Sequence, residues 1–316
     1  MKKRRILLAL IMLIITGISL TTATYAWFTA NKAVSVEEID VKATASGGIQ
    51  ISADAKSWSN EVTLEQLKNI TPEEGITLEN YFPETATMQP VTTVGTNNAT
   101  GKFTFFAGEL SDAGNTVKLT PVEDTSKLYA AFDLYFYSIK AQKLEFNTST
   151  AVRAKNVGSA GAAPVDKDLK SSVRVGFLFQ GNQGDANPAA ARGLKSGKVA
   201  DQQIWEPNAD RHSENAVNFG GVAQNSVVPT MGGIAETGDN YVSKTDSSKF
   251  KTVTISDHHL LTSNVDAVPA GTIFDFQPGI NKVRVYIWLE GQDVDNEDSV
   301  TLGSGVGVKL DFKTQE

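Results

Sequence analysis

Lys282-Val283-Arg284-Val285-Tyr286-Ile287-Trp288-Leu289-Glu290 is the stretch of sequence that decides the fold. One face of this stretch is apolar at every second position, at Val283, Val285, Ile287 and Leu289. Such alternation indicates a β-strand, because successive side chains of a strand point to opposite faces of a sheet. Tyr286 and Trp288 make the other face largely apolar as well, so we expect this strand in the centre of a sheet with its aromatic side chains in the core.

A second strand with the same alternation lies near the C-terminus. Its apolar face consists of Val306, Val308, Leu310 and Phe312. The segment between the two strands is rich in Gly, Asp and Asn, which are typical turn residues. We therefore predict that residues 282–290 and 306–312 pair as a hairpin.

β-Branched and aromatic runs recur along the rest of the chain, whereas helical periodicity is scarce. The sequence therefore predicts an all-β protein with one short helix over residues 63–70, where Thr63 and Gln66 have the spacing of a capping box. The predicted strands are 36–44, 48–53, 102–106, 128–139, 172–180, 251–256, 282–290 and 306–312.

The amino-acid composition changes between residues 181 and 270. This segment is rich in Gly, Asn, Ala, Ser and Asp and has few long apolar runs. Pairs such as Gly220-Gly221 and Gly232-Gly233 suit backbone conformations with positive φ. We therefore predict long loops or an inserted subdomain in 181–270 rather than a second core.

The N-terminus has the pattern of an export signal. Four basic residues, 2–5, precede an uncharged stretch over 6–31. Clustered positive charge stays on the cytoplasmic side, and roughly 20 apolar residues in a helix can cross about 30 Å of hydrocarbon. We therefore predict that the chain enters the membrane through this segment during export and that the bulk of the protein is extracellular or on the cell surface.

Two outcomes are open for this N-terminal segment. Small residues in Thr24-Tyr25-Ala26 suit a signal peptidase that cuts between Ala26 and Trp27, so that 1–26 is a signal peptide and 27–316 is an extracellular domain. Alternatively the segment stays attached as an anchor up to about residue 31, with its aromatic residues at the membrane interface. A lipoprotein is excluded, because the chain has no cysteine to acylate.

Composition excludes several function classes. The absence of cysteine removes disulfides and thiol nucleophiles, and in an exported protein it fits a Gram-positive-type bacterium. The net charge of −7 argues against nucleic acid as a partner, because binding it requires clustered positive charge. Only three histidines are present, and no H-E-x-x-H motif is found. With no recognisable catalytic constellation, we predict that the protein is not an enzyme.

An acidic loop after residue 290 is the best candidate for a metal site. Asp293, Asp295, Glu297 and Asp298 place oxygen ligands close together, as calcium prefers. The spacing is similar to the start of an EF-hand loop, although Asp298 stands where that loop has glycine. The alternative is a solvated acidic hairpin loop, and no other cofactor is expected.

Two short motifs carry a family resemblance. Thr24-Tyr25-Ala26-Trp27-Phe28-Thr29 resembles the junction of exported proteins processed by the SipW type of signal peptidase, among them the TasA and camelysin group of biofilm matrix fibre proteins. The second motif, within 285–293, resembles a tryptophan-leucine-glutamate-glycine-x-aspartate signature of uncharacterised exported proteins from Gram-positive bacteria.

The first resemblance implies a jelly-roll-like β-sandwich that assembles into fibres by strand pairing between subunits. In that group the N-terminus created by cleavage can complete the sheet of a neighbour, and strand addition of this kind gains backbone hydrogen bonds and side-chain pockets. The inserting side chains would be Val34, Val36, Ile39 and Val41, with Glu37-Glu38 interrupting the alternation. The alternative is an ordinary first strand that pairs within its own sheet.

A surface adhesin or carbohydrate-binding module, anchored at the membrane, is the rival interpretation. Loops of a sandwich commonly carry such sites. Trp205 in the 181–270 segment is its best contact residue, because an exposed indole can stack on a sugar ring.

Overall fold

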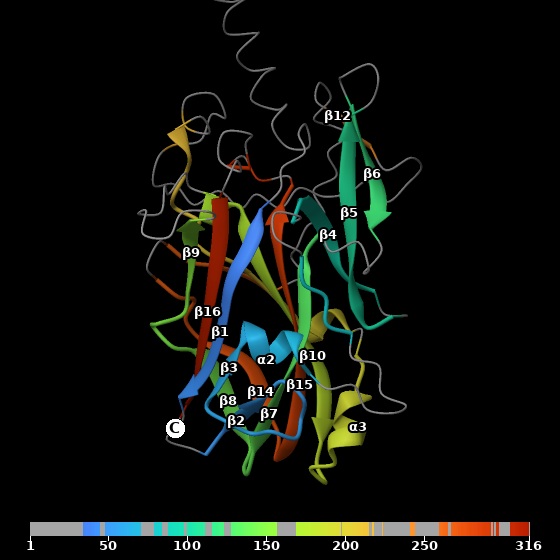
Figure 1. Cartoon of the computed structure of the whole chain (residues 1–316), viewed down its shortest axis with the longest axis vertical. Helices are drawn as coiled ribbons and strands as arrows, with labels where there is room; N and C mark the ends of the chain where they lie inside the picture. Colours follow the sequence, from blue (N-terminus) through green and yellow to red (C-terminus); the bar gives the residue numbers. More distant parts are fainter. Residues whose placement is uncertain are drawn as a thin grey trace, which may run out of the picture.

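Strands dominate the computed structural model of the chain, and they form two large mixed sheets (Figure 1). The prediction of an all-β protein is therefore confirmed. Among the described helices, none has the length and apolar character needed to cross a membrane. The predicted signal segment and its cleavage site lie outside the described residues. These are 34–44, 48–70, 79–83, 88–97, 100–110, 116–122, 128–156, 169–196, 198–214, 217, 223, 241–243, 259–264, 267–291, 293, 295–296 and 304–315.

The first sheet has six strands in the order β14-β8-β16-β1-β3, with β9 also paired to β16. Its strands are β1 (Ser35–Thr44), β3 (Glu61–Thr63), β8 (Gln142–Phe146), β9 (Ala151–Asn156), β14 (Thr272–Phe276) and β16 (Ser304–Thr314). The pairing of β1 with β16 is parallel, and the other pairings in this sheet are antiparallel. Figure 1 shows β1 in blue beside β16 in red, so the two ends of the described chain meet in one sheet.

The second sheet has ten strands in the order β12-β6-β5-β4-β15-β10-β11-β13, with β7 paired to β15 and β2 paired to β7. Its strands are β2 (Gln50–Ser52), β4 (Pro90–Asn97), β5 (Lys102–Leu110), β6 (Thr116–Val122), β7 (Ala130–Ser138), β10 (Val173–Gln183), β11 (Gln202–Glu206), β12 (Tyr241–Ser243), β13 (His259–Thr262) and β15 (Gly279–Glu290). All residues of β15 are buried, and β10 and β7 flank it. The expected central position of this strand is confirmed.

The main core lies between the two sheets. The apolar face of β15 and the apolar face of β16 belong to the same hydrophobic cluster. The predicted hairpin between them is wrong, because β15 pairs with β10, β7 and β4, whereas β16 pairs with β1, β8 and β9. Alternation identified which side chains are buried, but it carries no information about which strand lies alongside.

Most of the predicted elements are present in the described chain. The short helix α2 (Leu64–Lys68) has Thr63 as its N-cap, and the capping box with Gln66 is formed as predicted. Among the predicted strands, 251–256 lies outside the described residues and the others coincide with strands.

The described part of the 181–270 segment adds to the folded sheet. It contributes α3 (Pro188–Arg192), the strand β11 that pairs with β10, and the strand β13 that pairs with β11. The described strands of this segment, β11, β12 and β13, therefore belong to the ten-stranded sheet and form no separate core among the described residues.

Candidate functional site

The first site to consider is β1, the strand expected to pair between subunits. Val34, Ile39 and Val41 are fully buried in the main core, and Val36 packs against the same core. Within this single chain, β1 pairs with β16 and β3 of the six-stranded sheet. The register of β1 against β16 shifts between Val36 and Glu38, so the predicted interruption of the alternation is a β-bulge.

A cross-strand ion pair lies at this bulge. The Lys155 ammonium on β9 forms an ion pair with the Glu38 carboxylate on β1. Between them lies Gly307 of β16, where a Cβ atom would come within 2.8 Å of the Lys155 side chain. Glycine therefore opens a path along which Lys155 crosses β16 to reach Glu38.

The described residues cover the other edge of β1 only in part. Among the described strands, β3 pairs with Asp40, Val41 and Lys42 but not with the first half of β1. An isolated bridge joins Val34 to Met88. Among the described residues, the first half of β1 therefore pairs mainly with β16.

Trp205 does not have the exposure that a sugar platform needs. Its side chain is 1% exposed, and its indole Nε1 donates a hydrogen bond to Ser263 Oγ at 3.0 Å. The ring packs 5.2 Å from the ring of Phe146 in the main core. The predicted ligand contact is therefore corrected to a core position, because β11 turns this side chain inwards.

The outer face of β15 carries Lys282, Arg284, Tyr286, Trp288 and Glu290. At its middle, Phe103 of β5 stacks on Tyr286 with ring centroids 4.4 Å apart. The aromatic residues of this middle layer form a second hydrophobic cluster with Phe105 and Tyr129. The outer face of β15 therefore has a basic end and an acidic end with aromatic rings between them.

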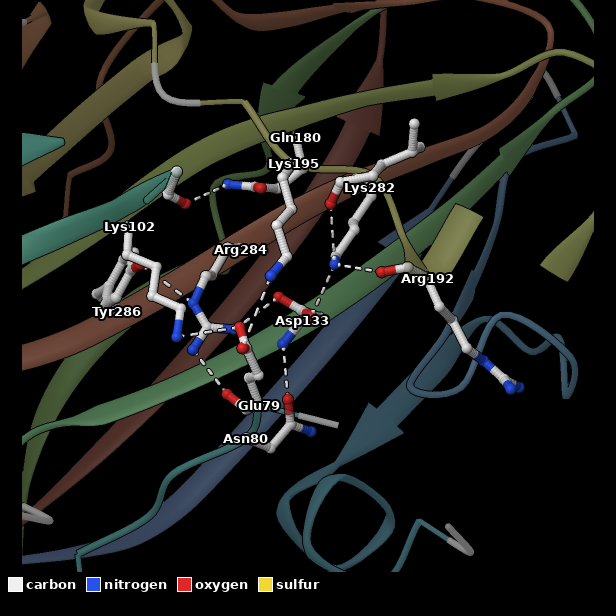
Figure 2. A network of polar contacts seen from close by, with 12 residues as sticks. Glu79, Asn80, Lys102, Asp133, Gln180, Arg192, Lys195, Lys282, Arg284 and Tyr286 are labelled. Atoms are coloured by element: carbon white, nitrogen blue, oxygen red, sulfur yellow. Dashed lines mark hydrogen bonds and ion pairs between the residues drawn. The ribbon is translucent and has the colours of Figure 1, made fainter. Parts of the chain in front are cut away.

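The basic network is defined here as Lys282, Arg284, Asp133 and Glu79. Asp133 accepts from Arg284 Nη1 at 2.9 Å and from Lys282 Nζ at 3.1 Å, and Figure 2 shows it between the ends of these two side chains. Arg284 Nη2 also donates to the Glu79 carbonyl at 2.6 Å. Burial raises the pKa of Asp133, but the charges of Arg284 and Lys282 outweigh burial and hold this pKa below its usual value.

The basic network also has further anchoring contacts at its periphery. Lys102 forms an ion pair with Glu79 at 3.1 Å, and Lys282 Nζ donates to the Arg192 carbonyl at 2.8 Å (Figure 2). The guanidinium Nε of Arg284 donates to the Tyr286 hydroxyl at 3.1 Å. These bonds hold the two buried cations in one geometry.

The acidic network is defined by six buried side chains at the other end of β15. Its members are Arg174, Glu206, His212, Glu290, Asp293 and Asp295. Arg174 Nη2 contacts Glu206 Oε1 at 2.7 Å and Asp293 Oδ2 at 2.5 Å. Asp295 Oδ2 lies 2.9 Å from His212 Nδ1, and Asp295 Oδ1 accepts from the Ser213 amide at 2.8 Å.

Two carboxyls of the acidic network have pKa values far from the ordinary range. Burial, assisted by the nearby charges of Asp293, Glu290 and Asp295, raises the pKa of Glu206 to about 7 although Arg174 opposes this shift. Burial and the charge of Asp293 raise the pKa of Asp295 to about 7, against the opposing effect of the Ser213 amide and His212. Protons are therefore held by this network close to neutral pH.

This geometry bears directly on the predicted calcium loop. Asp293 and Asp295 are buried and bonded to protein groups, so the alternative of a solvated loop is wrong for these two residues. Glu297 and Asp298 lie outside the described residues, and no group of three or more acidic or histidine side chains within the described ranges could hold a metal ion. Calcium binding through Asp293 and Asp295 would require Arg174 and His212 to release them.

Sequence reasoning missed the partners of these networks. Arg174 is 119 residues from Asp293, and Asp133 is 151 residues from Arg284, so no local spacing connects them. The available signal was the presence of charged residues within strands whose neighbours are apolar. A charge at such a position is buried, and buried charges require partners.

A cleft of about 430 Å³ lies beside α2 and α3, and Asp54, Gln66 and Arg192 are among its lining residues. Three of its polar side chains already bond within the protein. Arg192 Nε donates to the Asp54 carbonyl at 2.7 Å, and the Asp54 carboxylate accepts from the Ser57 amide at 2.7 Å. Gln66 is committed to the capping box of α2. The cleft therefore adds no independent support for a carbohydrate-binding role.

Comparison with known proteins returned no match to any family model, any curated protein or any solved structure.

Proposed function

We propose that this chain is an exported structural protein of the cell surface or extracellular matrix, and that it assembles into fibres by exchanging β1 between subunits. The export pattern of the N-terminus and the resemblance of its junction to the matrix fibre group support this function. The position of β1 carries the proposal. It is the first described strand, yet its full-length partner is the last strand, so the pairing does not depend on any local connection.

The side chains of β1 make exchange energetically reasonable. Val34, Ile39, Val41 and Ala43 are at most 4% exposed and fill the core between the sheets. A sandwich that lacked this strand would expose apolar surface and an open edge of β16. An identical strand from a second copy would restore both, at a stability gain of roughly 25 cal/mol for each Å² of apolar surface that it covers.

Engineered cysteines can identify which copy supplies β1, because the natural chain has none. Asp40 and Lys309 are register partners on the outer face of the six-stranded sheet. In the double variant Asp40→Cys with Lys309→Cys, exchange between subunits predicts disulfide-linked ladders on a non-reducing gel after oxidation of polymers. A pairing within each chain predicts linked monomers only.

The control pair is Glu145→Cys with Lys313→Cys, which are partners on β8 and β16. Neither strand is exchanged in the proposal, so this variant should give linked monomers even in polymers. Polymers of the Asp40 and Lys309 variant that dissolve into linked monomers would overturn strand exchange. A protein that stays monomeric under electron microscopy at all concentrations would overturn the fibre function itself.

A further inference from the structure

The inward side chains of β1 do not by themselves fix its register on β16. Ile39, Val41 and Ala43 are aliphatic, buried and placed at every second position. A shift of one residue would turn them out of the core, so their alternation excludes it, whereas a shift of two residues would keep them inside. The choice between registers that differ by two residues therefore requires a further determinant.

Charged residues on the outward face of the six-stranded sheet can supply this determinant. In the observed register, Asp40 lies opposite Lys309, and Lys42 lies opposite Asp311. Burial and a hydrogen bond with Glu61 raise the pKa of Asp40, whereas the charges of Lys42 and Lys309 lower it, so Lys309 is close enough to interact with this carboxyl. Both register pairs therefore join opposite charges.

A shift of two residues in either direction would place like charges opposite each other. Moving β1 towards the end of β16 would set Asp40 against Asp311 and Lys42 against Lys313. Moving β1 the other way would set Lys42 against Lys309. Like charges directly opposite each other on neighbouring strands are destabilising. Of these three registers, only the observed one therefore avoids a like-charged pair between Asp40 or Lys42 and β16.

A third contact of this face spans three strands, which Figure 1 shows in the order β9, β16 and β1. Glu38 lies opposite Gly307, which has no side chain, and the Lys155 ammonium reaches the Glu38 carboxylate from β9. The surface that binds the charged face of β1 is therefore made by two strands, β16 and β9.

We propose that the charges on this face select the strand that pairs with β16 and β9 and fix its register. These register charges are Glu38, Asp40 and Lys42 on β1, and Lys155, Lys309 and Asp311 on the receiving strands. Specificity is a difference between matched and mismatched pairs, so surface pairs that are individually weak can supply it together. One consequence rests on the proposed function: in a fibre, the strand that matches this surface is β1 of a second copy of the chain.

Urea unfolding of the intact natural chain and three variants tests the register charges within one molecule. The first variant reverses β1 (Glu38→Lys with Asp40→Lys), the second reverses the receiving strands (Lys155→Glu with Lys309→Asp), and the third combines all four changes. Each half-reversed variant should have an unfolding equilibrium constant about tenfold above that of the natural chain, and the combined variant should return to within about threefold of it. A combined variant whose loss of stability equals the sum of the two half-reversed losses would overturn the proposal.

A matched control separates these pairs from the effect of net charge. Adding Lys140→Glu and Lys198→Glu to the reversed β1 gives the same net charge as the combined variant, at two exposed positions outside the strands of the six-stranded sheet. This control should not restore stability, and a restoration equal to that of the combined variant would overturn the proposal. The single exchange Glu38→Lys with Lys155→Glu, at side chains that are 47% and 41% exposed, repeats the cycle if the combined variant does not fold.

Mixed assembly tests the consequence for fibres. Natural and combined chains that carry different dyes should form separate fibres, whereas natural chains that carry the same two dyes should form mixed fibres. Random mixing of natural and combined chains would overturn selection by the register charges and leave the fibre function standing. If neither chain forms fibres, the proposed function fails, and the unfolding measurements still decide whether the register charges fix the pairing of β1.

Discussion

The two ends of β15 both bury charged side chains, but the balance between positive and negative charge is opposite at the two ends. At the basic end, two buried cations share the carboxylate of Asp133, whose pKa is held below its usual value. At the acidic end, one guanidinium faces several carboxyls, and the pKa values of Glu206 and Asp295 rise to about 7. The comparison indicates that a network with excess buried cations keeps its protonation state near neutral pH, because these cations do not readily release protons. A network with excess carboxyls changes its protonation state near neutral pH.

We expect the largest effect on stability from a substitution that disrupts the basic network. Asp133→Asn leaves both Lys282 and Arg284 without their shared negative charge, so we expect the free energy of unfolding to fall by about 3–5 kcal/mol. The loss should be similar at pH 5.5 and pH 8, because Asp133 is ionised at both. Urea unfolding at the two pH values measures it. A loss that differed between them by more than about 1 kcal/mol would show that this end also titrates near neutrality.

We expect the second-largest effect on stability from a substitution that disrupts the acidic network. Arg174→Met removes the guanidinium from between Glu206 and Asp293, and we expect a loss of about 3 kcal/mol at pH 8. At pH 5.5 the loss should be smaller by about 1 kcal/mol or more, because the carboxyls can neutralise themselves by taking up protons. The matched control, Arg153→Met on the exposed face of β9, should change stability by about 0.5 kcal/mol or less. Equal losses at both pH values for Arg174→Met would contradict the comparison.

The third effect disturbs the aromatic layer that separates the two ends. A Cβ atom at Gly176 would lie 2.5 Å from Phe103 Cε2 and 3.0 Å from Trp288 Cζ3. Gly176→Ala should therefore cost about 1–3 kcal/mol through overpacking, independently of pH. Gly184→Ala is the control, because its added Cβ meets no atom within 4 Å. Thermal melts of both variants measure the difference, and equal melting temperatures would refute the tight packing at Phe103.

The smallest effect needs no substitution. For Glu206 and Asp295 the folded pKa lies above the ordinary value, so the folded state binds the additional protons and stability falls as pH rises towards 7. We expect the natural chain to be about 1–2 kcal/mol more stable at pH 5.5 than at pH 8. Urea unfolding at the two pH values measures this difference. A larger free energy of unfolding at pH 8 than at pH 5.5 would contradict the prediction.

Much of the fold was predictable from residues that alternate. The period of two in β15 and β16 identified their buried faces, and the capping box identified α2. Strand partners were not predictable, because alternation is the same whether the neighbour in the sheet is the next strand along the chain or the first. The parallel pairing of β1 with β16 replaced the expected hairpin for this reason.

The sequence also predicted some features of the candidate sites and missed others. The interruption at Glu37-Glu38 was visible in the sequence, and it proved to be a bulge. Trp205 was misjudged, because its surroundings in sequence are polar and the residues that bury it, such as Phe146, are distant along the chain. The raised pKa values of the acidic network depend on contacts between four separate segments, so composition alone could not reveal them.

The parallel pairing of β1 and β16 also has a kinetic consequence. Ser35 and Gly305 are register partners although 270 residues separate them, so the first strand has no partner in β16 until almost the whole chain has been synthesised. Contacts of such long sequence separation give a high contact order and slow folding. The six-stranded sheet therefore cannot close until β16 has been synthesised, so we expect its completion to be a late step of folding.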